Sequence, residues 1–525
     1  MKNYRFEETI SKEVLENYLS RSVTAAGLFE SETLSDDLRV IKDLGVKFLG
    51  RASGIWYVEM DDNQHFQMTE ELADKVHQVD PDIILQACIF ECIVECIEDI
   101  KIPEYVFSDF GMEPEDRTFR LCDTLFLEKP KGYIFKRKER NKNGGIPDLS
   151  RIETQMWFYY RATSYINCGF EALHMGQIHL YTANDRGLIK TQKVFQMIRD
   201  YGRKHARRHK VLLDAHTHGI NINGELLFDY HAMPFTRVPL MEVKGNKLVL
   251  VREGYSEGGK NPNGWSAQEM PYLMEYDNWG GQVVENRDDY TREELAKKDW
   301  WGYDQIAWFA NQNEKDRNHF LEYTYRWLEI NNINGYFEVP FRRMLGDGYV
   351  VRERADNGQR EVQNYYQINR QSKDCPMGFS QEEMVKELWK SGHELREKAC
   401  NPQMQIWYGA RDEFDKQTGI KLPEKIVVYG SFQPFAGAIE NDSNSEVTRM
   451  YYIGDGNYVL SVLIPFAGTY DYSISTYGTL SATYQDDPYP RSGSSAKAEF
   501  VIQKDNTAVK FTYNFIQNRV TVETY

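Results

Sequence analysis

Carboxylate side chains stand at the ends of several short apolar runs, where they could do acid–base chemistry. Glu275 and Asp277 lie two residues apart in MPYLMEYDNWGG, and Glu338 stands in NGYFEVPFRRM. Asp214 follows the apolar residues of KVLLDAHTHG. Two carboxylates that lie close together repel each other, so one keeps its proton while the other stays ionised. Hydrolysis of a glycosidic bond needs such an acid and such a base or nucleophile, and we take these four as candidate catalytic residues.

Polar or aromatic residues at the ends of the other apolar runs are candidates for binding a substrate. They are Arg51, Glu91, Gln177, His216, Trp279 and Arg342. Charged groups buried at one end of a fold are costly unless they are paired or functional, so their recurrence favours a site. Trp279 follows Asp277 by two residues, and an indole face can cover the apolar face of a pyranose ring. The set therefore predicts a carbohydrate substrate.

The stretch DAHTHG also fits a metal site. His216 and His218 alternate, so on a strand they would point to the same side and could share one ion. The stretch resembles the first-strand D-x-H-x-H motif of the amidohydrolase superfamily, which would imply a zinc-dependent hydrolase. That pattern needs further strand-end histidines, and the ones downstream are His231, His319 and His393. Because the last two fall within helical patterns, we favour a polar strand end, with no metal and no cofactor, and keep the metal-dependent hydrolase as an alternative.

Seven apolar runs rich in β-branched or aromatic residues alternate with longer amphipathic segments. The runs span residues 45–56, 82–91, 169–180, 210–219, 224–235, 270–281 and 334–344. Helical patterns cover residues 68–79, 152–167, 187–208 and 313–332. This alternation predicts βα units and a parallel sheet. No Gly-rich phosphate loop follows the first run, which argues against a dinucleotide-binding sheet. We predict the α/β class and a (β/α)8 TIM barrel, whose site lies at the carboxyl ends of its strands.

The pattern changes near residue 424 to period-two alternation rich in Val, Tyr, Phe and Thr, with Gly, Asp and Asn at the turns. Such a pattern is typical of an all-β sandwich. The predicted organisation therefore has four parts. They are an N-terminal helical lead-in at 1–35, the catalytic barrel at 36–370, a helical connector at 371–423 and the β-sandwich at 424–525.

The last hundred or so residues resemble the small β-sandwich modules attached to pullulanases and related α-glucan-active enzymes. The resemblance lies in the stretches VVYGSFQ, IPFAGTYDYSI and AVKFTYNF. Those modules usually carry a Trp-bearing loop after the central strand, where this chain reads TYGTLSATYQ. The resemblance implies the fold of a carbohydrate module more than a sugar-binding role. The strand ends GFEALHMGQ, LMEYDNWGG and YFEVPFRR are similar to those of glycoside-hydrolase barrels, without the Arg-x-Asp and His-Asp signatures of the α-amylase family.

Composition limits the partners. The formal net charge of −16 disfavours binding to nucleic acid or to an anionic membrane, because the average surface would repel either one. No apolar run reaches transmembrane length and no signal-peptide core precedes the first helix, so we expect a cytoplasmic protein, or a secreted one if a signal peptide has been removed. A glycoside hydrolase acting on an oligo- or polysaccharide is the favoured function, and a non-catalytic carbohydrate-binding protein is the second alternative. The oligomeric state is left open.

Overall fold

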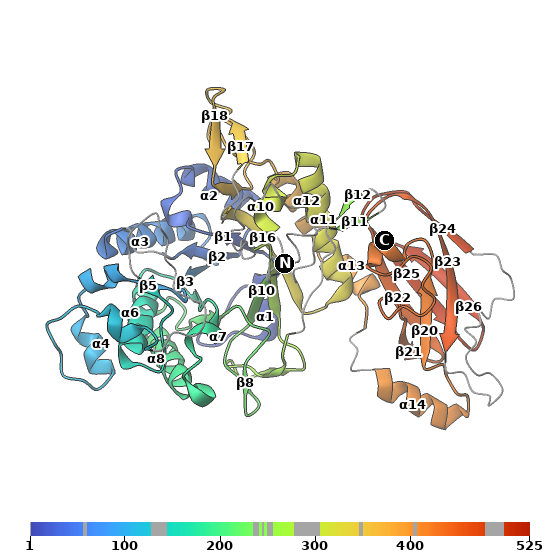
Figure 1. Cartoon of the computed structure of the whole chain (residues 1–525), viewed down its shortest axis with the longest axis horizontal. Helices are drawn as coiled ribbons and strands as arrows, with labels where there is room; N and C mark the ends of the chain where they lie inside the picture. Colours follow the sequence, from blue (N-terminus) through green and yellow to red (C-terminus); the bar gives the residue numbers. More distant parts are fainter. Residues whose placement is uncertain are drawn as a thin grey trace.

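The computed structural model describes residues 2–55, 60–127, 144–234, 241–243, 246–248, 256–277, 305–345, 350–402, 407–477 and 498–525, with backbone only at 241–248 and 407–412. Eight parallel strands form its central sheet (Figure 1). In order around the sheet they are β1 (Ser22–Ala25), β2 (Phe48–Ser53), β3 (Ile84–Cys88), β6 (Ala172–His174), β7 (Leu212–Asp214), β10 (His231–Pro234), β15 (Tyr272–Glu275) and β16 (Gly335–Met344).

The sheet closes on itself in both directions. β16 pairs with β1, and the remaining gap between β7 and β10 is bridged by a parallel pairing of His216 with Ala232. The amide of Thr217 donates to the carbonyl of Ala232 at 3.1 Å across the same gap. This is the strand order of a (β/α)8 barrel, so the predicted fold class is confirmed.

Helices cover most of the outer surface. The barrel helices are α2 (Leu34–Leu44), α3 (Asp62–Val79), α6 (Ile152–Asn167), α8 (Ile189–His205), α11 (Glu314–Asn331) and α12 (Glu382–Ser391). Shorter helices are α4 (Glu104–Asp109), α5 (Leu121–Thr124), α7 (Ile178–Tyr181) and α10 (Gln305–Ala310). After β7 and β10 the described chain has short strands instead of helices. They are β8 (Asn221–Ile222), β9 (Glu225–Leu226), β13 (Gly259–Lys260) and β14 (Ser266–Ala267), which form one sheet, and the hairpin β11 (Met241–Val243) with β12 (Asn246–Leu248).

The predicted boundaries of the barrel are wrong at both ends. β1 lies inside the segment expected to be a helical lead-in. It was missed because SVTA contains only one large apolar residue, Val23, and so does not stand out as an apolar run. At the other end, α12 belongs to the barrel layer instead of the connector. It packs against α2 and α11, and Arg39 of α2 pairs with Glu382 at 2.8 Å.

Helix α1 (Lys12–Leu19) closes the bottom of the barrel. The hydroxyl of Ser11 caps it by accepting from the amide of Val14 at 3.2 Å. Its buried face packs against an apolar layer inside the barrel that contains Phe48, Ile84, Ala172, Leu212, Leu273 and Tyr336. Residues in alternate positions, such as Leu49, Leu85 and Leu213, face outward into the main core under the helices.

The C-terminal residues form two antiparallel sheets packed face to face. One contains β20 (Lys425–Tyr429), β23 (Gly468–Tyr477) and β24 (Ala498–Ile502). The other contains β21 (Tyr451–Gly454), β22 (Asn457–Ile464), β25 (Thr507–Asn514) and β26 (Arg519–Thr524). The ring of Phe511 lies 5.4 Å from that of Phe432 and 5.5 Å from that of Phe500, which fills the space between the sheets. The predicted β-sandwich is therefore present.

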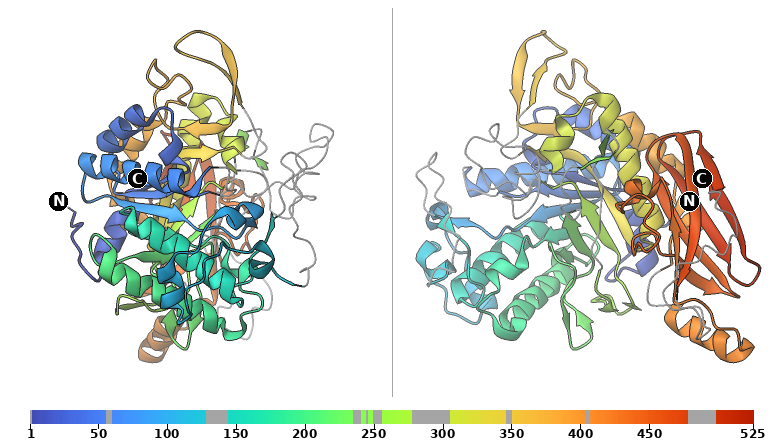
Figure 2. Two further views of the ribbon diagram at one scale, coloured as in Figure 1. Left: turned by 90° about the vertical axis from the view of Figure 1, so that its left-hand side faces the viewer. Right: turned by 45° about the vertical axis from the view of Figure 1, so that its right-hand side comes forward.

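The sandwich lies beside the barrel and packs against α11 (Figures 1 and 2). His319 Nε2 lies 2.8 Å from the carbonyl of Pro465, and Arg326 donates to the carbonyl of Tyr525 at 2.6 Å. The short helices α13 (Glu394–Ala399) and α14 (Trp407–Thr418) link the two units. The remaining strands are β4 (Ile93–Val94), β5 (Gly144–Gly145), β19 (Tyr365–Gln367) and the projecting hairpin of β17 (Val350–Glu353) with β18 (Arg360–Gln363). No helix in the described part of the chain is both long and apolar enough to cross a membrane.

Candidate active site

Polar side chains form a second layer inside the barrel, directly above the apolar one. Each stands two residues beyond an apolar interior residue, because side chains on a strand alternate between its two faces. The layer consists of Gln86, His174, Asp214, Glu275 and Glu338, all buried. On β2 this position is Gly50, where a Cβ atom would lie 1.9 Å from Glu338 Oε1. The carboxyl ends of the strands therefore enclose three carboxyl groups, as the sequence predicts.

Arg51 binds Glu275 across the barrel. It donates from Nη1 to Oε2 at 2.6 Å and from Nη2 to Oε1, and His216 Nε2 lies 2.7 Å from Oε1. Burial alone would raise the pKa of Glu275, but Arg51, Arg343 and His216 outweigh it and hold that pKa well below its usual range. Glu275 is therefore ionised at neutral pH. Arg51 reaches it from a left-handed backbone conformation with φ 56°, which is uncommon for a side chain of this size.

Arg343 binds Asp277, the next polar residue along the chain from Glu275. Its Nη2 donates to Asp277 Oδ1 at 2.7 Å and lies 3.5 Å from Glu275 Oε2. Arg342 had been expected at the site, but its Nη1 donates to the carbonyls of Ala26 and Gly27 at 2.5 and 3.0 Å.

A β-bulge explains why Arg343 replaces Arg342. Thr24 of β1 pairs with Pro340 and Ala25 pairs with Arg342, so Phe341 is an extra residue on β16. An extra residue reverses which side chains face inward along the rest of the strand.

Asp214 holds His174 through a network inside the barrel. Its Oδ1 accepts from Gln86 Nε2 at 2.6 Å and from the Tyr230 hydroxyl at 3.1 Å, and its Oδ2 lies 2.8 Å from His174 Nδ1. Burial raises the pKa of Asp214 to about 7. Burial, followed by Arg51 and His216, lowers the pKa of His174 well below its usual value, so its ring is neutral. Asp214 thus fixes the orientation of a neutral imidazole.

Glu338 stands opposite Glu275 in the register of β15 and β16. Burial and the negative charge of Glu275 raise the pKa of Glu338 to about 7. From the sequence we expect one of two neighbouring carboxyls to keep its proton, and Glu275 and Asp277 are the predicted pair. In the structure the carboxyl beside Glu275 whose pKa is raised is Glu338, on the adjacent strand.

Glu91 and Gln177 lie in the segments that follow β3 and β6. Glu91 Oε2 accepts from the amide of Gln177 at 3.2 Å, and its Oε1 lies 3.4 Å from Gln177 Nε2. Gly176, at φ 57°, leaves room for the carboxyl, because a Cβ atom there would lie 2.4 Å from Oε2. Burial raises the pKa of Glu91. Trp279 lies outside the described residues.

A cluster of possible metal ligands does form, but it differs from the predicted one. Within the described chain it contains His216, Glu275 and Asp277, whose ligand atoms lie within 4.8 Å of one another, and it does not contain His218. Both carboxylates already pair with guanidinium groups, which would repel a cation.

The other histidines do not complete the predicted metal site either. His231 Nδ1 lies 2.7 Å from Ser256 Oγ, His319 lies at the sandwich interface, and His393 Nδ1 lies 3.1 Å from Glu329 Oε1. Among the described residues, the ligand set of the amidohydrolase pattern is therefore not assembled.

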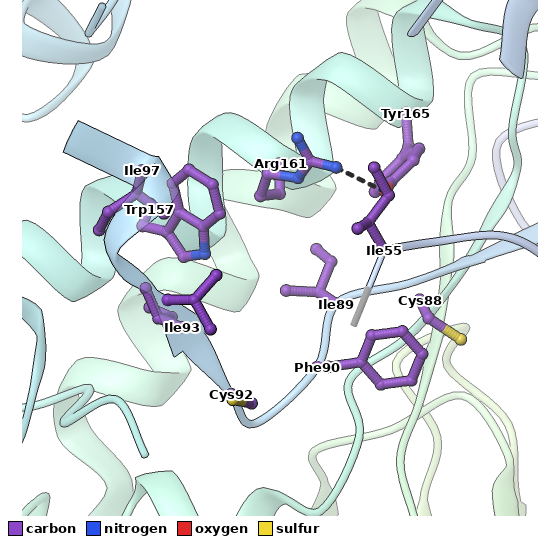
Figure 3. Close-up of a pocket in the computed structure, with 11 residues that line it drawn as sticks. Ile55, Cys88, Ile89, Phe90, Cys92, Ile93, Ile97, Trp157, Arg161 and Tyr165 are labelled. Carbon is purple, nitrogen blue, oxygen red and sulfur yellow. Dashed lines mark hydrogen bonds between the residues drawn. The ribbon is translucent and has the colours of Figure 1, made fainter. Parts of the chain in front are cut away.

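A small cavity lies between the segment after β3 and helix α6 (Figure 3). Ile89 and Phe90 line it from one side and Trp157 from the other, while Arg161 donates to the Tyr165 hydroxyl at 2.8 Å. The segment that carries Glu91 therefore forms one wall of this cavity.

Four residues of the candidate site were not among the candidates taken from the sequence. They are Gln86, His174, Tyr230 and Arg343. Gln86 and His174 could have been found from the sequence. Each stands two positions after an apolar residue of its run, as Asp214 does. Tyr230 and Arg343 carried no such signal, because one precedes its strand and the other follows a bulge.

No protein-family model matches the chain, and no curated protein sequence matches it. Solved structures of glycoside hydrolases are similar to it. Eubacterium rectale Amy13B is 9% identical with a TM-score of 0.36, and 86% of each chain is covered. The Nostoc punctiforme debranching enzyme is 10% identical with a TM-score of 0.34, covering 89% of this chain and 91% of its own. A β-L-arabinopyranosidase from Geobacillus stearothermophilus is 10% identical with a TM-score of 0.33, covering 87% and 88%. The assignment of the barrel itself rests on its strand order and register.

Proposed function

We propose that the protein hydrolyses glycosidic bonds in an oligo- or polysaccharide, at the carboxyl ends of the barrel strands. The observation that carries the proposal is the contrast between Glu275, held ionised by Arg51, and the neighbouring buried carboxyls, whose pKa values burial raises. They are Glu91, Asp214 and Glu338. An ionised carboxylate near a carboxyl that holds its proton more tightly is the machinery that glycoside hydrolysis requires.

Glu275 is the carboxylate we assign to the anomeric carbon. Positive charge develops on the sugar ring in the transition state, and an ionised carboxylate stabilises it as a nucleophile or as the base for water. Asp277, Arg343 and the neutral ring of His174 supply hydrogen-bonding groups for sugar hydroxyls. The reaction needs no cofactor.

A panel of aryl glycosides, covering several sugars and both anomers, tests the proposal. We expect turnover of at least one sugar, and a loss of at least about a hundredfold in kcat/KM in Glu275→Gln. Glu104→Gln, on the exposed face of α4, is the matched control and should leave kcat/KM unchanged. Absence of turnover across the panel would contradict hydrolysis. Sugar binding that survives in both variants would then favour the non-catalytic alternative.

The cluster of His216, Glu275 and Asp277 makes a metal-dependent hydrolase the second candidate. Metal analysis of protein purified without added metal separates the two functions. We expect less than about a tenth of an equivalent of zinc, because Arg51 and Arg343 neutralise both carboxylates. One equivalent of zinc, lost together with activity on chelation, would favour the metal-dependent reaction.

A further inference from the structure

The proposed hydrolysis needs a proton donor, and the surroundings of the buried carboxyls separate the candidates. Asp214 has both oxygens engaged, by Gln86 and Tyr230 on one side and by His174 on the other. Glu338 lies within β16, and its carboxyl fills the space beside Gly50 that a Cβ atom would occupy. The barrel wall therefore encloses this carboxyl. Both carboxyls therefore lie in the same layer as Glu275, whereas the acid and the nucleophile or base must flank the glycosidic bond from different positions.

Glu91 lies beyond the end of its strand instead of within it. β3 ends at Cys88, and Glu91 follows three residues later, over Gly176 at the end of the neighbouring strand β6. The carbonyl of Gly176 accepts from the amide of His216 at 2.9 Å. His216 in turn contacts Glu275 at 2.7 Å. His216 therefore lies near both carboxyl groups, since it contacts Glu275 and acts electrostatically on Glu91.

The partners of Glu91 leave room for a proton and for a substrate. Its oxygens accept from Gln177 at 3.2 and 3.4 Å, which are long hydrogen bonds. The backbone amides of Glu91 and Gln177 lower the pKa of this carboxyl, but less than burial raises it. Gln177 Oε1 is buried and has no hydrogen-bond partner in the described part of the chain, so it is an acceptor available to a sugar hydroxyl. The charged and titratable groups that act on Glu91 are His216, Asp277 and Tyr181. Burial is the largest influence and favours the protonated form.

We propose that Glu91 is the catalytic acid that protonates the leaving oxygen, an assignment that rests on the proposed glycosidase function. The bond between the anomeric carbon and the glycosidic oxygen breaks, and its electron pair stays on that oxygen. The carboxyl proton of Glu91 forms the new O–H bond of the leaving alcohol. Water supplies the hydroxyl group that ends on the anomeric carbon. Its other proton goes to the carboxylate of Glu91 if Glu275 has acted as the nucleophile, and to Glu275 if Glu275 is the base for water.

The test compares two glycosides of the sugar that the aryl-glycoside panel identifies. A 2,4-dinitrophenolate leaves without a proton, whereas a phenolate needs one. In Glu91→Gln we expect kcat/KM to fall about 10²- to 10⁴-fold for the phenyl glycoside and less than about tenfold for the dinitrophenyl glycoside. A catalytic acid must be protonated, so the alkaline limb of the wild-type pH profile should disappear in the variant. Glu104→Gln should match the wild type on both substrates.

Each result decides the assignment. Equal losses on the two glycosides, with the alkaline limb kept, would mean that Glu91 only positions the site, and the assignment would be overturned while the hydrolase stands. No turnover of any glycoside by the wild-type protein would overturn both proposals together. Circular dichroism and urea unfolding confirm that the variant is folded before either rate is compared.

Discussion

Replacing Arg51 with methionine removes the principal partner of Glu275. Arg51 donates to both oxygens of that carboxylate, and the two residues are 7% and 1% exposed. Breaking a buried ion pair from one side costs about 3–5 kcal/mol, because the remaining charge is left uncompensated. Arg343, 3.5 Å from Glu275 Oε2, still compensates in part, so we expect Arg51→Met to lower the free energy of unfolding by about 3 kcal/mol at neutral pH.

The sign of the pH effect follows from the depressed pKa of Glu275. In the folded protein this pKa lies below its unfolded value, so the stability from the pair is present above the unfolded value of about 4.3. It is lost as the pH falls through the lower, folded-state pKa. In Arg51→Met the pKa of Glu275 rises, and the acid limb of the kcat/KM profile should move toward neutral pH.

Urea unfolding of a double-mutant cycle measures the interaction independently of any substrate. In a Glu275→Gln background, Arg51→Met should cost less than about 1 kcal/mol, which gives a coupling energy of about 2 kcal/mol or more. Equal costs in the two backgrounds would refute the assignment of Arg51 as the group that keeps Glu275 ionised. Arg360→Met, at an exposed position on β18, is the matched control and should change stability by less than about 0.5 kcal/mol.

Three further predictions concern neighbouring residues. The pKa of Asp214 is about 7 in the folded protein and about 3.9 in the unfolded chain, so this residue lowers the free energy of unfolding as the pH rises between the two values. In Asp214→Asn the loss of stability between pH 4 and 8, measured by urea unfolding, should be smaller. Arg343→Ala should reduce kcat/KM on the active aryl glycoside by more than about tenfold, whereas Arg342→Ala should change it by less than about threefold. Gly50→Ala should destabilise the protein by about 1–3 kcal/mol in thermal or urea unfolding, and Glu338→Ala should relieve part of that loss; no relief would mean that the two groups do not collide.

The sequence predicts most of the barrel because most of its strands lie within runs of large apolar residues. All seven apolar runs contain a barrel strand, and the four helical patterns fall on α3, α6, α8 and α11. β1 escapes because SVTA contains one large apolar residue, Val23. The four catalytic candidates could be located by the rule that active sites stand at the carboxyl ends of barrel strands. Three of them, Asp214, Glu275 and Glu338, share one interior layer.

Partners of the carboxylates are harder to predict than the carboxylates themselves. Asp214 and Glu275 end regular strands, so alternation from Leu212 and Leu273 gives their facing directly. The guanidinium groups come from irregular positions. Between β2 and β3 the register jumps from the pair Leu49–Leu85 to the pair Ser53–Ala87, and Arg51 lies inside that jump. Within such a segment the alternation of side chains does not predict which residues face the barrel interior.

Both irregularities have the same result, since each directs an arginine at the same pair of carboxylates. The left-handed backbone of Arg51 costs on the order of 1–3 kcal/mol, and such conformations persist where surrounding interactions determine them. Its buried bonds to Glu275 are a sufficient reason, because losing them would leave the carboxylate uncompensated at a similar or greater cost. The bulge at Phe341 likewise brings Arg343 to Asp277. The two departures from regular strand geometry are therefore what keep Glu275 and Asp277 compensated inside the barrel, and they are the features that one sequence does not reveal.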